Sequence, residues 1–274
     1  MLGAIVGDIV GSVYEWNNIK TKDFQLFSEY CFFTDDTVMT IAVAEAIMDG
    51  GKADNFIDSM IKWGRLYPYS GYGGKFGNWI HSDDHMPYNS WGNGSAMRVS
   101  PCAEFAARAF YPGDRPESII DNALRLAEIS ASVTHNHPEG IKGAQATAYA
   151  MAISSGFSAD IAKKHIREDI PKLYGYDLSK TCDEIRPNYR FNESCQDTVP
   201  QAIAAFLEST DFEDAIRNAI SLGGDSDTLA AITGSIAEMA YGIPDWIKDK
   251  ALGYLDKPLI EVYERWRQFL KFEG

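Results

Sequence analysis

The chain has 274 residues, and its 45% hydrophobic and 23% charged residues are typical of a folded globular protein rather than a disordered one. Its 25 basic and 39 acidic residues give a net charge of −14, which argues against general nucleic-acid binding because such a surface repels phosphate backbones. No stretch approaches the roughly 18 uncharged apolar residues of a membrane span, and the four cysteines lack CxxC spacing. We therefore expect a cytoplasmic protein with reduced thiols and no membrane partner.

The first predicted helix covers residues 2–16 and carries an apolar stripe along one side. Beside that stripe a glycine recurs at every fourth position, which would let a second helix approach closely. These glycines are Gly3, Gly7 and Gly11. The remaining face carries Asp8 and Glu15, and Asp8 is open to a structural role as a hydrogen-bond partner of a neighbouring loop.

Helical periodicity continues through the rest of the chain, without strand alternation and without a Ser/Pro linker. The further predicted helices are 35–48, 53–66, 100–110, 116–131, 139–155, 159–173, 198–208, 211–222, 228–241, 244–253 and 257–271. Four prolines, Pro116, Pro138, Pro200 and Pro244, are expected at helix starts. Two long segments, 67–95 and 174–197, are predicted to be loops. The pattern predicts one all-α domain spanning residues 1–274.

Two predicted helices begin with similar acidic stretches, TDDT at 34–37 and DSDT at 225–228. Thr34 is a good N-cap and the helix dipole favours carboxylates in the first turn, so capping alone explains either stretch. Two such stretches together also supply the carboxylate and hydroxyl oxygens that Mg²⁺ or Mn²⁺ prefers. If both helix starts meet in space, cations between them would offset the repulsion among four carboxylates. The pattern leaves capping and a two-metal site as alternatives.

Two further segments could contact a ligand. The run GNGSAMR at 92–98 offers backbone N–H groups for close approach, or it is a plain turn before a helix. The run THNHP at 134–138 lacks the additional ligands that zinc needs, so His135 is either a polar contact to a ligand or a satisfied turn histidine.

Six segments together resemble the ADP-ribosylglycohydrolase family, in order and spacing, from residue 1 to about 255. They are GAIVGDIVGSVYE, FTDDTVMT, GNGSAMRVSP, SVTHNHPEGIKGAQATA, TVPQAIAAF and SLGGDSDTLAAITGSIA. The resemblance implies a compact orthogonal all-α bundle with a binuclear site for two divalent cations, Mg²⁺ or Mn²⁺.

The resemblance also implies roles for individual residues. By position, the metal ligands are Thr34, Asp35 and Asp36 on one side and Asp225, Asp227 and Thr228 on the other. Glu15 matches the glutamate of the serine-ADP-ribose and poly(ADP-ribose) branch, and it would be catalytic together with Asp36 and Asp227. The substrate-binding residues implied by the motif are Ser90, Trp91, Gly92, Asn93, Gly94 and His135.

The activity that the resemblance implies is metal-dependent release of ADP-ribose from a modified acceptor, either a serine or an arginine side chain. The partner would be an ADP-ribosylated protein or a small ADP-ribosyl compound such as O-acetyl-ADP-ribose. The alternatives are a non-catalytic ADP-ribose binder, a structural relative of the same fold, and a metal-dependent phosphohydrolase acting on a nucleotide.

Overall fold

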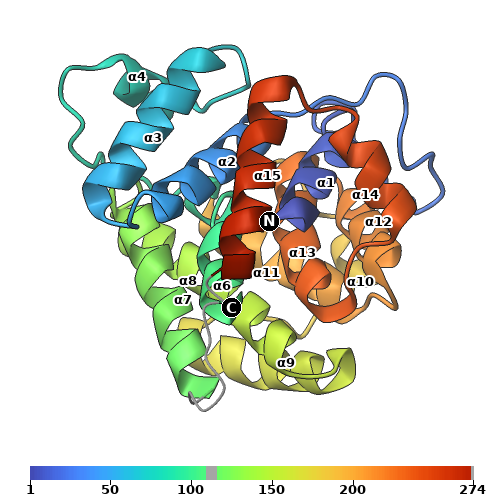
Figure 1. The fold of residues 1–274 in the computed structure, drawn as a ribbon. Coiled ribbons are helices and arrows are strands. Elements are labelled where there is room, and N and C mark those ends of the chain that lie inside the picture. Colours follow the sequence, from blue (N-terminus) through green and yellow to red (C-terminus); the bar gives the residue numbers. More distant parts are fainter. Residues whose placement is uncertain (109–115, 273–274) are drawn as a thin grey trace.

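Every regular element in the part of the chain that the structure describes is a helix (Figure 1). The structure is a computed structural model, and it describes residues 1–108 and 116–272. Gly92 and Ser194 form an isolated antiparallel bridge between two loops. The prediction of an all-α protein is confirmed.

The helices follow one another along the whole chain, joined by loops of very different length. In order they are α1 (Leu2–Gly11), α2 (Asp35–Met48), α3 (Ala53–Leu66), α4 (Gly74–His81), α5 (Gly94–Met97), α6 (Ser100–Arg108), α7 (Pro116–Ser132), α8 (Pro138–Gly156), α9 (Ala159–Tyr174), α10 (Cys182–Ile185), α11 (Cys195–Leu207), α12 (Phe212–Leu222), α13 (Ser226–Tyr241), α14 (Asp245–Leu252) and α15 (Lys257–Phe272). The prediction of a helix over 100–110 ends on residues 109–110, which lie outside the described residues.

The first helix is shorter than predicted, because α1 ends at Gly11 and the chain turns before Glu15. The Asn18 side-chain amide donates hydrogen bonds to the carbonyl oxygens of Tyr14 and Glu15, at 2.7 and 2.9 Å. In a continued helix these carbonyls would accept from backbone N–H groups further along the chain. Glu15 therefore lies in a turn, and the prediction that places it on the helix face with Asp8 is wrong.

Both predicted loops contain short helices. In 67–95, α4 buries Phe76, Trp79 and Ile80 at helical spacing, a pattern that the surrounding glycines obscure in the sequence. In 174–197 the structure has α10 and the first turn of α11. Pro200 consequently lies inside α11, not at its start as predicted, since the Ser194 side chain caps the helix by accepting from the N–H of Asp197.

The glycine row of α1 lies directly against α13, and the two helices run side by side (Figure 1). A Cβ atom built on Gly7 would lie 2.1 Å from the carbonyl oxygen of Ala230, and one on Gly11 would lie 2.4 Å from the Cα of Asp227. Such separations are far below van der Waals contact, so only glycine permits this approach. The prediction of a close helix neighbour is confirmed.

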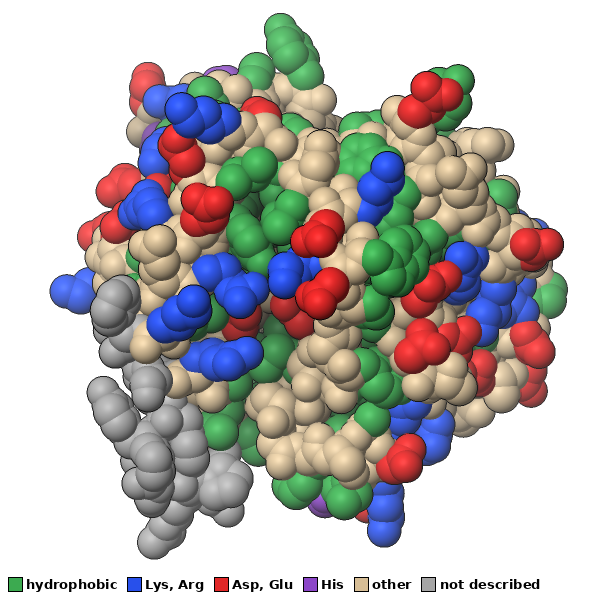
Figure 2. Space-filling model, turned by 45° about the vertical axis from the view of Figure 1, so that its right-hand side comes forward, with side chains coloured by type: hydrophobic (Ala, Val, Ile, Leu, Met, Phe, Trp, Pro, Cys, Tyr) green, Lys and Arg blue, Asp and Glu red, His purple; other side chains and the backbone are tan. Residues whose placement is uncertain are grey.

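α13 is buried from Ser226 to Ala237, and helices from both halves of the chain pack around it. None of the helices in the described ranges combines the length and the apolar character that crossing a membrane requires. Figure 2 shows one face of the molecule, on which acidic and basic side chains are intermixed and hydrophobic side chains lie between them.

Candidate metal centre and ligand pocket

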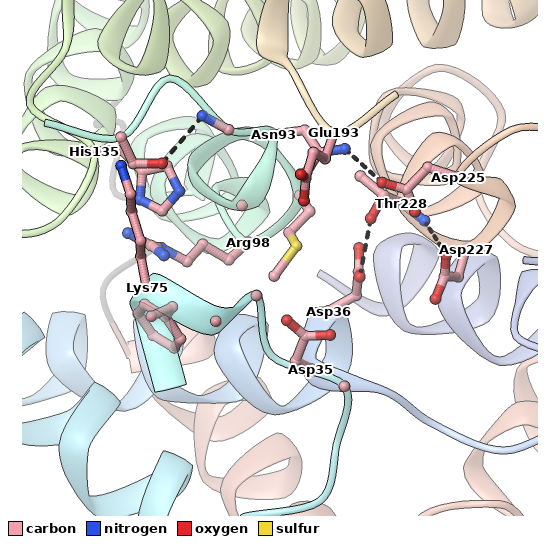
Figure 3. Close-up of a pocket in the computed structure, with 18 of the residues that line it drawn as sticks. Asp35, Asp36, Lys75, Asn93, Arg98, His135, Glu193, Asp225, Asp227 and Thr228 are labelled. Atoms are coloured by element: carbon pink, nitrogen blue, oxygen red, sulfur yellow. Dashed lines mark hydrogen bonds between the residues drawn. The ribbon is translucent and has the colours of Figure 1, made fainter. Parts of the chain in front are cut away.

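The two acidic helix starts meet in space, as Figure 3 shows. Asp36 from the first turn of α2 and Thr228 from the first turn of α13 are joined by a hydrogen bond of 3.2 Å, from the threonine Oγ1 to the Asp36 Oδ2. Asp35 lies beside Asp36 on the α2 side, and Asp225 and Asp227 lie next to them on the α13 side. Residues almost two hundred positions apart thus form one cluster of carboxylates.

The start of α2 is held by Asp8 of α1, which is completely buried. Its carboxylate accepts from the backbone N–H groups of Thr34 and Thr37, at 2.9 and 3.0 Å, and from both threonine hydroxyls. Thr34 is also the N-cap, since its Oγ1 accepts from the N–H of Asp36. Asp8 therefore has the structural role that the sequence left open.

The start of α13 is held differently. Gly223 and Gly224 have φ of +69° and +77°, values that favour glycine, and they turn the chain sharply into the helix. Asn18 stabilises this turn with two hydrogen bonds. Its Oδ1 accepts from the Gly224 N–H at 2.7 Å, and its Nδ2 donates to the Gly224 carbonyl at 2.9 Å. Asn93 donates to Asp225 at 2.7 Å, so its amide faces this carboxylate.

The carboxylates lie close enough to share a cation. One oxygen of each of Asp8, Asp36 and Asp227 lies within 4.8 Å of the others, and so does one oxygen of each of Glu15, Asp225 and Asp227. The two groups share Asp227. Asp36 Oδ1 is buried and has no hydrogen-bond partner among the described residues. A buried, unpaired carboxylate oxygen is costly unless a cation or water completes it.

Burial and mutual repulsion act on these groups together. Burial, and then the charge of Asp227, hold the pKa of Asp36 well above its usual range. Burial and Asp225 raise the pKa of Asp227 in the same direction. Burial raises the pKa of Asp225 to about 6, and burial followed by the charge of Asp227 raises that of Glu15 to about 7. The donor set is therefore all hard oxygen with an excess of negative charge, which fits divalent cations such as Mg²⁺ or Mn²⁺.

A cavity of about 560 Å³, called here the first cavity, opens from this cluster. That volume lies within the roughly 300–1,000 Å³ range of small-molecule sites. The predicted residues that line it are Glu15, Asp35, Asp36, Ser90, Trp91, Gly92, Asn93, Gly94, His135, Asp225, Asp227 and Thr228. Thr34 does not line it, and lies behind Asp36 with its hydroxyl bonded to Asp8.

The loop 90–94 is fixed against the loop that precedes α11. The N–H of Asn93 donates to the Glu193 carbonyl at 2.8 Å, and the N–H of Cys195 donates to the Trp91 carbonyl at 3.0 Å. This pairing includes the bridge between Gly92 and Ser194. The segment 174–197, whose role the sequence leaves undefined, thus supplies one wall of the first cavity.

His135 is buried behind the same loop. Burial, and then the charge of Arg98, lower its pKa well below the usual range, so the ring is neutral. Arg98 Nη2 donates to the Thr134 hydroxyl at 2.8 Å, and that hydroxyl lies 2.8 Å from His135 Nδ1. Because the Thr134 hydroxyl accepts from Arg98, we assign it as the hydrogen-bond donor to His135 Nδ1. The ring then carries its own proton on Nε2, which lies beside Gly94 and can donate.

Several pocket residues escape prediction from the sequence, and the most informative is Arg98. It is fully buried, and Nε has no partner within the described ranges, although burial lowers its pKa only to about 10 and leaves it charged at neutral pH. Figure 3 shows Arg98, Lys75 and His135 on the side opposite Asp225 and Asp227. Arg98 is the last residue of the GNGSAMR run, but nothing in the run separates it from an ordinary surface arginine.

Comparison of this fold with a solved structure identifies its class. A structure described as an ADP-ribosylglycohydrolase-related protein complex matches with a TM-score of 0.65 at 22% sequence identity, covering 92% of this chain and 95% of that one. The family model described as ADP-ribosylglycohydrolase matches residues 1–269. The chain belongs to the ADP-ribosylglycohydrolase family, which confirms the resemblance seen in the sequence motifs, and it is an enzyme of the glycohydrolase class.

Two of the curated relatives are ADP-ribosyl hydrolases of different kinds. ADP-ribosylarginine hydrolase Tri1 of Pseudomonas putida is 25% identical, over 97% of this chain and 77% of that protein. Human ADP-ribosylhydrolase ARH3 is also 25% identical, over 95% of this chain and 90% of its own length. Since the two identities are equal, overall similarity does not assign this chain to either kind.

Proposed function

We propose that this protein is a metal-dependent hydrolase that releases ADP-ribose from an ADP-ribosylated acceptor, an arginine or a serine side chain. The observation that carries the proposal is the meeting of the two helix starts, where Asp36 and Thr228 are hydrogen-bonded and Asp36 Oδ1 has no partner among the described residues. Capping alone explains neither the contact between the two helices nor an unpaired buried carboxylate oxygen.

The residues present fit two divalent cations, Mg²⁺ or Mn²⁺. The residues that would hold them are Thr34, Asp35, Asp36, Asp225, Asp227 and Thr228, all of which offer hard oxygen donors. Bound cations would orient the hydroxyl groups of the sugar and stabilise negative charge that develops near them.

Glu15 is the residue we propose for proton transfer. It is half-buried in the turn after α1, and one of its carboxylate oxygens lies within 4.8 Å of oxygens from Asp225 and Asp227. A carboxylate in that position can accept a proton from the attacking water.

The opposite side of the first cavity suits the diphosphate of ADP-ribose. Arg98 and Lys75 supply positive charge there, and His135 supplies a neutral N–H donor. The glycines of the loop 90–94 leave room for a ligand to approach the backbone of this loop. Trp91, which is 46% exposed, offers a ring face at the cavity wall.

The test is release of free ADP-ribose from peptides ADP-ribosylated on arginine or on serine. We expect release with Mg²⁺ or Mn²⁺ and its loss in EDTA. The substitution Asp249→Asn neutralises an exposed carboxylate on α14, outside the first cavity, and this variant should retain full activity. If the folded wild-type protein released no ADP-ribose from any of these substrates with either metal, the proposal would be wrong.

A further inference from the structure

A second cavity, of about 500 Å³, meets the first at the carboxylate cluster. Glu15, Asp35 and Asp227 line both cavities. The first cavity extends from these carboxylates toward Arg98 and His135, and the second extends toward the loops 32–34 and 66–71. A ligand in the first cavity with its reactive atom at the cluster would therefore have a second compartment on the other side of that atom.

The second cavity is built mainly of aromatic rings. They belong to Trp16, Phe32, Phe33, Tyr67 and Tyr69. Trp16 is 80% exposed, Phe32 53% and Tyr69 99%, although burial of such rings normally stabilises a protein. Large aromatic side chains gathered at the surface around a cavity mark a binding site, because packing the protein's own core does not require them there.

Part of this wall is held rigidly. Tyr67 stacks on Trp63 with ring centroids 5.9 Å apart, meets Phe33 edge-on at 5.7 Å, and donates its hydroxyl to Asp256 at 2.8 Å. The N–H of Asp35 donates to the Ser70 carbonyl at 2.8 Å, so the loop is tied to the start of α2. The floor of the cavity is thus fixed relative to the carboxylate cluster, whereas the more exposed Phe32 and Tyr69 lie at its rim.

The two cavities differ in charge away from the carboxylates that they share. The first contains the basic residues Lys75 and Arg98, which suit an anion, and also the acidic Asp36, Glu193 and Asp225. Among the described residues that line the second, none is a lysine, arginine or histidine, and the charged ones are Glu15, Asp35 and Asp227. Asp35 and Asp227 are among the proposed metal ligands, so the ring faces are the feature of this cavity that attracts a cation. A planar guanidinium can stack on them.

We propose that the second cavity holds the acceptor of the bond to be cleaved and that this acceptor is the arginine side chain of an ADP-ribosylated protein. This inference rests on the proposed function, since it takes the first cavity as the ADP-ribose site. A serine acceptor is small and uncharged, so it would not use the ring faces. An arginine acceptor uses them, because its guanidinium is cationic before and after cleavage.

The reaction balances without a further reagent. The oxygen of one water molecule forms a bond to the anomeric carbon of the ribose, and the bond from that carbon to the guanidinium nitrogen breaks. The electron pair of the broken bond goes to the nitrogen, which receives a proton from the same water. The products are free ADP-ribose and an unmodified arginine side chain, and the second cavity would hold this cation until it leaves.

The test compares acceptors in variants that alter the second cavity only. Phe32→Ala and Tyr69→Ala should each lower kcat/KM for an arginine-ADP-ribosylated peptide by about fivefold to tenfold, the size expected for loss of one cation–π contact. Neither should change kcat/KM for O-acetyl-ADP-ribose or the Kd of ADP-ribose, because those ligands leave the second cavity unfilled. Phe32→Tyr, which keeps the ring face, should retain activity on the arginine peptide.

Phe157→Ala removes a ring that is 42% exposed, close to the 53% of Phe32, from the end of α8, and it is the matched control, with no effect on any substrate expected. The inference is overturned if the wild type prefers a serine-ADP-ribosylated peptide. It is also overturned if Phe32→Ala and Tyr69→Ala affect the arginine peptide and O-acetyl-ADP-ribose equally, or affect neither. Failure of the proposed function looks different, because the wild type would then release ADP-ribose from none of the substrates.

Discussion

The starts of α2 and α13 have similar sequences, but different parts of the chain hold them in place. The start of α2 depends on one fully buried carboxylate, Asp8, which accepts four hydrogen bonds from Thr34 and Thr37. The start of α13 depends on two left-handed glycines and on Asn18, an exposed side chain. Similar sets of candidate ligands are therefore held by a buried carboxylate at the start of α2 and by a solvent-exposed amide at the start of α13. Substitutions of Asp8 and Asn18 can measure how much each contributes.

The largest expected effect comes from neutralising one carboxylate on either side. Asp36→Asn and Asp227→Asn should each lower kcat/KM by about 1,000-fold, or about 4 kcal/mol, because each helix start supplies half of the proposed metal site. Titration calorimetry with Mg²⁺ or Mn²⁺ should show loss of metal binding in both. Asp49→Asn, at the far end of α2, is the control. Unchanged metal affinity in either variant would remove that helix start from the site.

Removing the support of α2 should have the next largest effect. Asp8→Ala leaves two backbone N–H groups and two hydroxyls without their acceptor, and we expect the free energy of unfolding to fall by about 3 kcal/mol. Urea unfolding measures this quantity directly. A variant as stable as the wild type would show that Asp8 does not anchor α2.

The metal-free protein should become less stable as pH rises. The pKa of Asp225 is raised to about 6 and that of Glu15 to about 7, both above their ordinary values. A group whose pKa is higher in the folded protein than in the unfolded chain stabilises the fold while it is protonated. This contribution is lost as pH rises through the folded-state pKa values of Asp225 and Glu15. We expect the free energy of unfolding in EDTA to fall by on the order of 1–2 kcal/mol between pH 5 and pH 8.

Saturating Mg²⁺ should abolish this fall in stability, because the cations replace protons as the neutralising charge. Asp227→Asn should reduce the fall even in EDTA, since it removes a neighbour that raises the pKa of Glu15. A decrease of equal size with and without Mg²⁺ would mean that other groups cause it.

The smallest effect is expected at the support of α13. Asn18→Ala removes hydrogen bonds to both backbone groups of Gly224, and because the side chain is exposed, water can replace them. We expect a loss of about 1 kcal/mol in the free energy of unfolding. Asn17→Ala, the exposed neighbour, is the matched control. If Asn18→Ala destabilised as much as Asp8→Ala, the contrast between the two supports would disappear.

Patterns that depend on neighbours along the chain were predictable from the sequence. The Thr34 cap, the helix periods and the glycine row of α1 are of this kind, because each reflects spacing within a few residues. The end of α1 was not predictable, because Asn18 diverts the carbonyls of Tyr14 and Glu15 through its side chain. Hydrogen bonds of this kind, from a side chain to nearby carbonyls, compete with the helix, and helical periodicity does not reveal them.

The candidate site was predictable in part. The two acidic stretches and Glu15 stand out in the sequence, but their meeting depends on packing between helices far apart along the chain. Arg98 and the aromatic wall around Phe32 and Tyr69 were not predictable, since a lone arginine or scattered exposed rings carry no spacing signal. The metals, the acceptor and the roles of the individual residues stay predictions that the experiments above test.

The contact of α1 with α13 through glycines has a consequence for how precisely the site is spaced. α1 carries Asp8, which positions α2, and at Gly11 its backbone touches the backbone of Asp227. The separation of α1 from the start of α13 is therefore set by main chain against main chain, with no intervening side chain whose rotamer could change it. A single methyl group at position 11 would push α1, and with it Asp8, away from Asp227, so this spacing tolerates no gradual variation.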